Sequence, residues 1–404
     1  MRLRDAPYAR SSVIYVVAGV AAPAIERLDV ALRSYVSHPA STEFRAFLGR
    51  NPSDEAIDAA TREAIVRLDE DLDPAGLIVR ARRLGFGVLP TRLVATEDAV
   101  AVAVNHGVMD GGPILEFVTW LMTAAANGTP TRDEREPVRF PLVKGVRKAG
   151  RSGVQEFLEA RRKPQLSPPR SHTPTPEDLS LQNARFATLS LDETELRRVA
   201  ALPSSGRSST NTRLVSVAIA ALARVYTGTE DVPVGIPVDL RRFVKNGRVL
   251  GNFIGVDAPT PLLAGDWSPA AITTRLVESA RSGAAMITVG YSVLRWLRYR
   301  PTAWLRRGRS GQGGAGDVSV FVPLLITREG FPDELWRPGG RAIIGATTIM
   351  DWPSSTTLGV LQFRQRAFAC LWDESGLFDV DEFPRAFESE VAARAAASSS
   401  APQA

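Results

Sequence analysis

The first part of the chain alternates between short runs that are apolar at nearly every position and segments with helical spacing of apolar residues. Unbroken apolar runs are typical of strands buried on both faces, while apolar residues three and four apart indicate a helix. The strands predicted here span residues 13–19, 77–82, 87–94 and 98–105. The predicted helices span residues 24–36, 54–69 and 113–127.

The second half of the chain mixes strands and helices in a similar proportion. Asp192 and Glu195, three residues apart, predict a capping box at the start of a helix after the strand 185–191. The apolar run 212–228 predicts a largely buried helix. The other strands expected here span residues 232–240, 251–260, 318–326, 341–349, 357–363 and 366–373. The other helices expected span residues 268–299 and 381–394.

The pattern changes between these two halves, where prolines and charged residues replace the apolar periodicity. We therefore predict a linker or crossover at residues 128–178. It separates an N-terminal unit, residues 1–127, from a C-terminal unit, residues 179–394. The closing residues 395–404, rich in alanine and serine, are predicted to be a disordered tail.

Composition narrows the class of protein. With 404 residues and 44% hydrophobic residues, the chain can bury a large core, and its net charge of +5 is too small to indicate nucleic-acid binding. The lone Cys370 lies in an apolar run, so it cannot form an intramolecular disulfide, and we expect a buried, inert thiol in a reducing compartment.

The N-terminus imitates a secretory signal, because Arg2, Arg4 and Arg10 precede an apolar segment that ends in small residues. The β-branched content of that segment and the helical spacing after it favour a strand followed by a helix. No apolar run reaches the length of a membrane span. We therefore expect a cytoplasmic protein without a membrane span.

The most informative stretch is "VAVAVNHGVMDGGP", residues 100–113, where a buried strand ends in one of only three histidines. A neutral imidazole can take a proton from a hydroxyl or amine near neutral pH, so His106 is a candidate general base. Asp110 could contact this ring or brace the turn from behind, and Gly111 permits a tight turn into the next helix. The alternative is a hydrogen-bonded histidine that only ends the strand.

His106, Asp110 and Gly111 form an HxxxDG motif, which resembles that of the chloramphenicol acetyltransferase-like superfamily. This superfamily includes CoA-dependent acyltransferases and the condensation domains of nonribosomal peptide synthetases. Three further stretches are similar to that family in the expected order: "AIERLDVALRSYVSHPAS", "TRLVSVAIAALARVYTGTEDVPVGIPVDLRR" with the following "LGNFIGV", and the closing "GVLQFRQRAFACLWDESGLFDVDEFPRAFESEV".

The resemblance implies an α/β (α+β) fold of two acetyltransferase-like subdomains in a V-shaped pseudo-dimer with a central tunnel. It implies that His106 is the base for attack on a thioester, and that Asp110 turns away to form a structural ion pair with Arg241. It also implies turn roles for Gly251 and Asn252. No permanent cofactor or metal is implied, and acyl-CoA or a phosphopantetheine thioester on a carrier protein is the co-substrate.

The sequence departs from that family at three places. Asn105 stands where condensation domains commonly carry a first histidine, which makes ester or simple acyl transfer a better expectation than amide synthesis on a carrier. The Asp-Phe-Gly-Trp-Gly block of the plant branch is absent, and "SVFVPLLITR" lacks a Ser-Asn pair often found in that strand. The group that stabilises the oxyanion is therefore not assigned.

Arginines and aromatic residues alternate in "RWLRYRPTAWLRRGR", residues 295–309. Such a segment could bind CoA phosphates, an acidic carrier protein or lipid headgroups, or simply be a solvated helix end. The candidate docking residues are Arg295, Arg298, Arg306 and Arg307. Residues 144–170 are also basic, which is compatible with a solvated crossover or a docking patch.

Other chemistry finds no support in the sequence, which has no Walker loop, no GxSxG elbow and no HExxH pair. We predict a monomeric acyltransferase of bacterial natural product biosynthesis that uses a small-molecule acceptor and an acyl-CoA or acyl carrier protein. The alternatives are a non-acylating condensation-like protein, either a carrier-docking module or a cyclase, and a basic surface-binding protein with a vestigial pocket.

Overall fold

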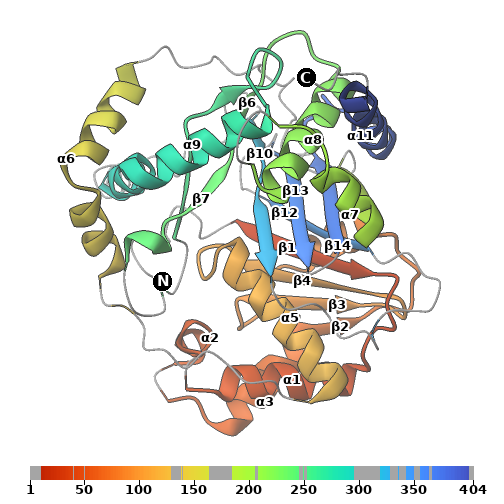
Figure 1. The fold of residues 1–404 in the computed structure, drawn as a ribbon. Helices are drawn as coiled ribbons and strands as arrows, with labels where there is room; N and C mark the ends of the chain where they lie inside the picture. Colours follow the sequence, from red (N-terminus) through yellow and green to blue (C-terminus); the bar gives the residue numbers. More distant parts are fainter. Residues whose placement is uncertain are drawn as a thin grey trace.

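Two mixed sheets, with helices against their faces, make up the computed structural model (Figure 1). The described residues are 11–39, 41–49, 51–128, 138, 140–162, 184–204, 208–244, 249, 253–294, 319–327, 335, 343–349, 355–363 and 366–399. This confirms the mixed α/β class. No helix within these ranges is both long and apolar enough to cross a bilayer.

The secondary-structure elements have the following bounds. The strands are β1 (Ser12–Ala18), β2 (Ile65–Arg67), β3 (Thr91–Ala95), β4 (Ala99–Asn105), β5 (Arg185–Leu191), β6 (Pro233–Gly235), β7 (Pro237–Asp239), β8 (Ile254–Val256), β9 (Thr260–Pro261), β10 (Ser319–Phe321), β11 (Leu324–Thr327), β12 (Ile343–Ile349), β13 (Ser355–Phe363) and β14 (Arg366–Asp373). The helices are α1 (Ile25–Ser37), α2 (Thr42–Leu48), α3 (Asp54–Ala64), α4 (Pro74–Leu84), α5 (Gly111–Asn127), α6 (Pro141–Arg162), α7 (Glu193–Ala200), α8 (Thr210–Val225), α9 (Pro269–Ser282), α11 (Phe383–Ser399) and the short 3-10 helix η3 (Arg241–Phe243).

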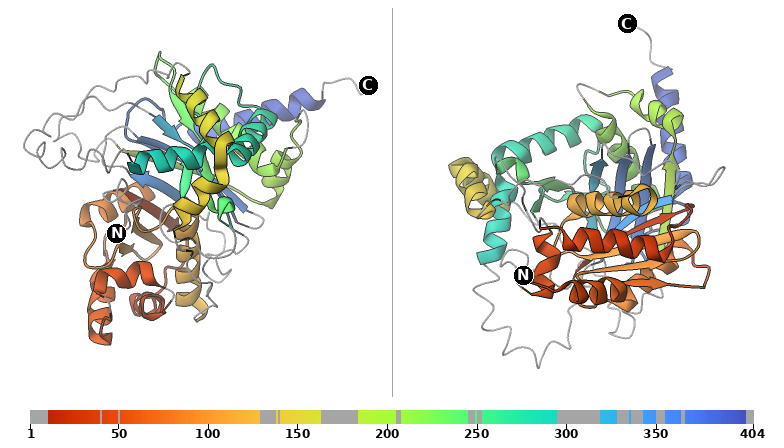
Figure 2. Two further views of the ribbon diagram at one scale, coloured as in Figure 1. Left: turned by 90° about the vertical axis from the view of Figure 1, so that its left-hand side faces the viewer. Right: turned by 90° about the horizontal axis from the view of Figure 1, so that it is seen from below.

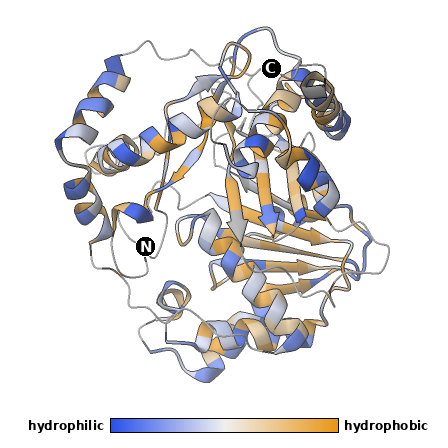
Figure 3. Ribbon diagram, viewed as in Figure 1, coloured by the Kyte–Doolittle hydropathy of each residue, from blue (hydrophilic) through white to orange (hydrophobic). Residues whose placement is uncertain are grey.

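The first sheet has the strand order β12-β1-β4-β3-β2. Helices α1 and α5 cover one face, where Tyr35 contacts Phe117 edge-on with ring centroids 4.6 Å apart. Helix α4 covers the other face through residues such as Leu77 and Ile78. Because both faces are buried, β1 and β4 have apolar residues at nearly every position, as Figure 3 shows by colour.

The second sheet is built from β5, β14, β13, β10, β6 and β9 in that order, with β11 also paired to β13. Helix α8 packs on it with ten buried residues along its length. The predicted capping box is confirmed, because Asp192 Oδ1 accepts from the Glu195 N–H and Glu195 Oε2 accepts from the Asp192 N–H. Strands β7 and β8 form a separate antiparallel pair that leads into η3.

Strand β12 joins the two sheets. It follows the predicted boundary by more than a hundred residues, yet it pairs antiparallel with β1 in the first sheet. The Ala346 N–H of β12 also donates to Cys370 Sγ of β14 at 3.3 Å. Burial raises the pKa of the Cys370 thiol to about 11, which agrees with the expected inert thiol. The boundaries of the two units stay a prediction, but the units share a core.

Three sequence predictions are wrong at the level of secondary structure. The helix predicted over 54–69 ends at Ala64, and residues 65–67 form strand β2. Residues 77–82, predicted as a strand, lie in helix α4, which Asp73 caps through the Gly76 N–H. The helix predicted over 268–299 is interrupted at Gly283, whose positive φ of 73° ends α9 before a second helical segment at 284–294. The strand prediction for 77–82 failed because Leu77, Ile78 and Ala81 lie on the same buried face only in a helix. A short apolar run does not distinguish this helix from a buried strand.

Two segments predicted without regular structure contain helix. The region 128–178 includes α6, which is broken at Gly150 (φ 61°) and packs along α9. Helix α11 continues through Ser399, so the first part of the predicted disordered tail is helical. Tertiary contacts support both helices, because α6 gains buried contacts from α9 and α11 packs against α8.

Candidate functional site

The candidate site begins where β4 ends. The His106 N–H donates to the Ser11 carbonyl at 2.8 Å, which extends the β1–β4 ladder by one residue, and the side chain is 4% exposed. Its ring Nδ1 lies 3.0 Å from the Met109 carbonyl oxygen. A carbonyl only accepts, so Nδ1 must carry the hydrogen and the lone pair of the neutral ring is on Nε2. The local turn therefore selects the tautomer of His106.

Burial lowers the pKa of His106 below its usual value of 6.5. The Met109 carbonyl and the charge of Asp110 oppose this effect, because both favour the protonated ring. Burial is the larger influence, so the ring is neutral at neutral pH. A neutral imidazole with its lone pair on Nε2 has the form that a general base requires.

Asp110 faces away from the histidine. Its Oδ2 accepts from Arg241 Nη2 at 2.7 Å and from the Phe253 N–H at 2.8 Å, and the side chain is fully buried. It stands at the N-cap position of α5 but makes no side-chain cap hydrogen bond. The carboxylate therefore links the HxxxDG turn to two segments of the second half of the chain.

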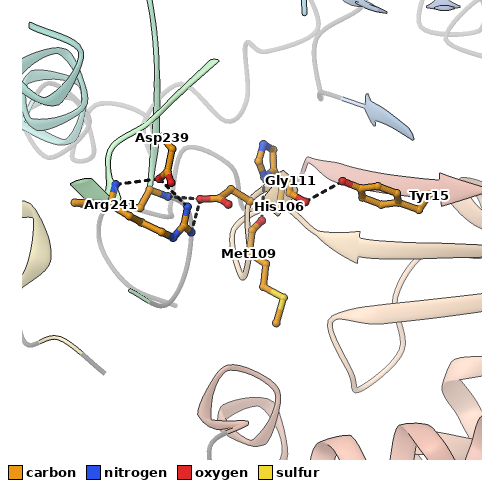
Figure 4. A network of polar contacts seen from close by, with 8 residues as sticks. Tyr15, His106, Met109, Gly111, Asp239 and Arg241 are labelled. Carbon is orange, nitrogen blue, oxygen red and sulfur yellow. Dashed lines mark hydrogen bonds and ion pairs between the residues drawn. The ribbon is translucent and has the colours of Figure 1, made fainter. Parts of the chain in front are cut away.

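Arg241 is held from two sides, as Figure 4 shows. In addition to the ion pair with Asp110, Arg241 Nη1 donates to Asp239 Oδ1 at 3.2 Å. The backbone N–H of Arg241 donates to the same oxygen at 2.9 Å. Burial alone lowers the pKa of Arg241, but the carboxylates of Asp110 and Asp239 outweigh it and the net shift is upward. Its side chain stays 25% exposed, whereas Asp110 has no exposure. The structure thus brings together the two residues that the family resemblance pairs.

The sequence did not reveal the role of Tyr15. This fully buried residue of β1 donates its hydroxyl to the Gly111 carbonyl at 2.8 Å. Burial, with smaller contributions from the charges of Cys370 and Asp110, raises the pKa of Tyr15 well above its usual value. The phenol is therefore a permanent donor that fixes the start of α5. The only signal of this role in the sequence is the hydroxyl of a tyrosine within an otherwise apolar strand.

Asn105 has a structural task at the position where condensation domains commonly carry a first histidine. Its Oδ1 accepts from the Gly107 N–H at 2.9 Å, and its carbonyl accepts from the Val108 N–H at 2.9 Å. These two bonds form the tight turn that carries His106.

Several predicted residues lie outside the described ranges. These are the candidate docking residues Arg295, Arg298, Arg306 and Arg307, and the turn residues Gly251 and Asn252. Within the described ranges, no cluster of three or more His, Cys, Asp or Glu side chains could hold a metal ion.

No protein-family model matches this sequence, and no curated protein matches it. Solved structures match along nearly the whole chain. The trichothecene 15-O-acetyltransferase TRI3 from Fusarium sporotrichioides is 11% identical with a TM-score of 0.57, over 97% of this chain and 92% of that chain. Polyketide synthase associated protein 5 from Mycobacterium tuberculosis is 15% identical with a TM-score of 0.53, over 98% and 97%. The starter condensation domain of rhizomide synthetase RzmA is 14% identical with a TM-score of 0.50, over 96% and 90%.

This chain has the condensation-domain-like fold. The likeness inferred from the HxxxDG stretch is therefore confirmed at the level of fold. Because these identities are low, the condensation-domain-like fold does not by itself assign a reaction, and the chemistry depends on the site described above.

Proposed function

We propose that this protein is an acyltransferase that moves an acyl group from a thioester to a hydroxyl or amine, with His106 as the general base. The observation that carries the proposal is the state of the His106 ring. Its Nδ1 donates to the Met109 carbonyl, and burial lowers its pKa so that the ring is neutral. The thioester is carried by CoA or by the phosphopantetheine of a carrier protein.

In this reaction His106 Nε2 takes the proton of the acceptor as the acceptor oxygen or nitrogen attacks the thioester carbonyl. The tetrahedral intermediate then collapses, the carbon–sulfur bond breaks, and the imidazolium returns the proton to the departing thiolate. No acyl group is attached to the protein, and no redox partner is needed. The Met109 carbonyl stabilises the positive charge that forms on the ring.

Asp110 supports this chemistry without taking the proton. Its Oδ2 is directed to Arg241 and to the Phe253 N–H, so it holds the turn in place instead of orienting the imidazole. Only 4% of His106 is exposed, so both substrates need a passage to reach Nε2. The proposal therefore includes a tunnel between two subdomains arranged in a V. The oxygen acceptor in the name of TRI3, a trichothecene 15-O-acetyltransferase, supports an ester-forming enzyme.

The test incubates the full chain with a panel of acyl-CoAs and acyl N-acetylcysteamine thioesters, each with simple alcohols and amines. We expect free thiol to appear together with a product that has gained the acyl mass. In His106→Ala both signals should fall by about 10²–10⁴-fold, the contribution of a general base. His38→Ala is the matched control and should leave the rate unchanged.

Near-normal turnover of folded His106→Ala would reject the assignment of the base. A product whose mass equals that of its substrate, with no thiol released, would instead support the cyclase alternative.

A further inference from the structure

Helix α6 lies at the edge of the molecule, on the outer side of α9 (Figures 1 and 2). Its inner face is fixed by close contacts at two glycines. A Cβ added at Gly145 would lie 2.5 Å from Met286 Cε, and one at Gly153 would lie 2.8 Å from the Ser282 carbonyl oxygen. These contacts leave no room for rotation of α6 about its axis, so its opposite face must point outward.

Aromatic packing fixes the C-terminal half of α6 in the same orientation. The Phe157 and Tyr291 rings lie 5.4 Å apart, and the guanidinium of Arg161 lies 4.7 Å from the centre of the Tyr291 ring. The outer face of α6 is therefore a defined surface with a fixed set of residues.

Apolar and cationic side chains follow one another along the exposed side of α6, on both helical segments that meet at Gly150. We name this set the outer stripe: Phe140, Val143, Arg147, Arg151, Val154, Leu158 and Arg162. All seven are exposed, and Phe140 and Val143 are exposed at 76% and 66%. Within the described part of the chain, none of the three arginines takes part in an ion pair.

The outer stripe carries no acidic residue. Two exposed acidic residues, Glu156 and Glu159, lie elsewhere on the helix surface, about 200° and 140° around the axis from Val154. The exposed basic residues of α6 outnumber them; these are Lys144, Arg147, Lys148, Arg151, Arg161 and Arg162. Leu294, at the end of the neighbouring helical segment 284–294, adds another apolar side chain, 66% exposed. The exposed surface of this edge is thus positive and apolar together.

We propose that the outer stripe of α6 binds the surface of an anionic lipid bilayer. Guanidinium groups pair well with phosphate oxygens, while Phe, Val and Leu side chains gain by entering the boundary of the acyl chains. The stripe follows a helix at the edge of the molecule, which suits an extended planar partner. The inference goes beyond the proposed acyl transfer and does not depend on it.

The test measures co-sedimentation of the full chain with vesicles of phosphatidylcholine, with and without phosphatidylglycerol, and needs no acyl substrate. We expect binding only when phosphatidylglycerol is present, and weaker binding at high salt. The double variant Arg147→Gln/Arg151→Gln should lose affinity by roughly fivefold for each arginine, about 25-fold in all. The double variant Val154→Asp/Leu158→Asp should also lose binding.

The matched control is Arg197→Gln/Arg198→Gln on α7, which removes two exposed arginines from a different helix and should bind like the unaltered chain. Far-UV circular dichroism verifies that each variant is folded. The proposal is overturned if the unaltered chain ignores anionic vesicles, or if the α6 and α7 variants bind equally. Binding to polyglutamate but not to vesicles would also overturn it, in favour of an acidic protein partner.

Discussion

The two ends of the HxxxDG turn are held in opposite ways. The imidazole ring of His106 is held by a neighbour in the chain, since its Nδ1 bonds to the Met109 carbonyl three residues away. Asp110 is held by partners 131 and 143 residues away, Arg241 and the Phe253 N–H. A turn of a few residues therefore carries one group that local structure positions and one that depends on the second half of the chain.

This difference separates the residue proposed for the chemical step, His106, from the residue that links the two halves of the chain, Asp110. The tautomer of His106 needs only the turn to fold, whereas the environment of Asp110 needs both halves to be in place. Changes on the Asp110 side should therefore act mainly on stability. Changes on the His106 side should act mainly on turnover.

The largest effect on stability is expected for Arg241→Ala. This change leaves the fully buried Asp110 carboxylate without its cation, at a cost of about 3–5 kcal/mol in the free energy of unfolding. Asp110→Ala should cost less, because Arg241 keeps Asp239 and partial exposure to water. The double variant should be more stable than Arg241→Ala alone. Urea denaturation of the three variants checks this, and equal stability of Arg241→Ala and the unaltered chain contradicts it.

Tyr15→Phe is expected to have the next largest effect. It removes the hydroxyl that satisfies the Gly111 carbonyl in a buried place, at a cost of about 1–3 kcal/mol. Because Gly111 follows the turn that carries His106, we expect kcat to fall more than KM rises, and the acid limb of the pH–rate profile to move. A purely structural tyrosine would leave that profile in place in the folded fraction.

A smaller change is expected for Asn105→Ala, which removes the acceptor for the Gly107 N–H. We expect a loss of about 0.5–1.5 kcal/mol in thermal or chemical unfolding. Asn105→Asp retains an acceptor oxygen and should recover most of that stability. If both variants are equally destabilised, the side-chain bond does not hold the turn.

The smallest expected effect concerns pH. Because the pKa of His106 is lowered in the folded protein, the neutral base persists below pH 6.5, and kcat/KM should fall only at more acidic pH. The same shift affects folding: above pH 6.5 this residue costs no stability, and stability declines as pH falls below 6.5, because the unfolded chain binds the proton first. A pH–rate profile with its acid limb above pH 6.5 contradicts the shift.

Much of the fold follows from the sequence where one local signal dominates. The capping box at Asp192 and Glu195 and the apolar strand before His106 were read correctly. Segment 77–82 was misread because three consecutive apolar residues suit a strand or a buried helix. The decisive signal was Asp73 followed by Pro74, which starts a helix.

The sequence by itself determined the elements with strong periodicity and the place of the tight turn at residues 105–111, but the bond from His106 Nδ1 to the Met109 carbonyl was found only in the structure. Only the tertiary structure decided that β12 enters the first sheet, that Tyr15 supports Gly111, and which way Asp110 points. The physical reason is that periodicity reports which face of an element is buried, whereas the partner that buries it is set by packing between segments far apart in the chain.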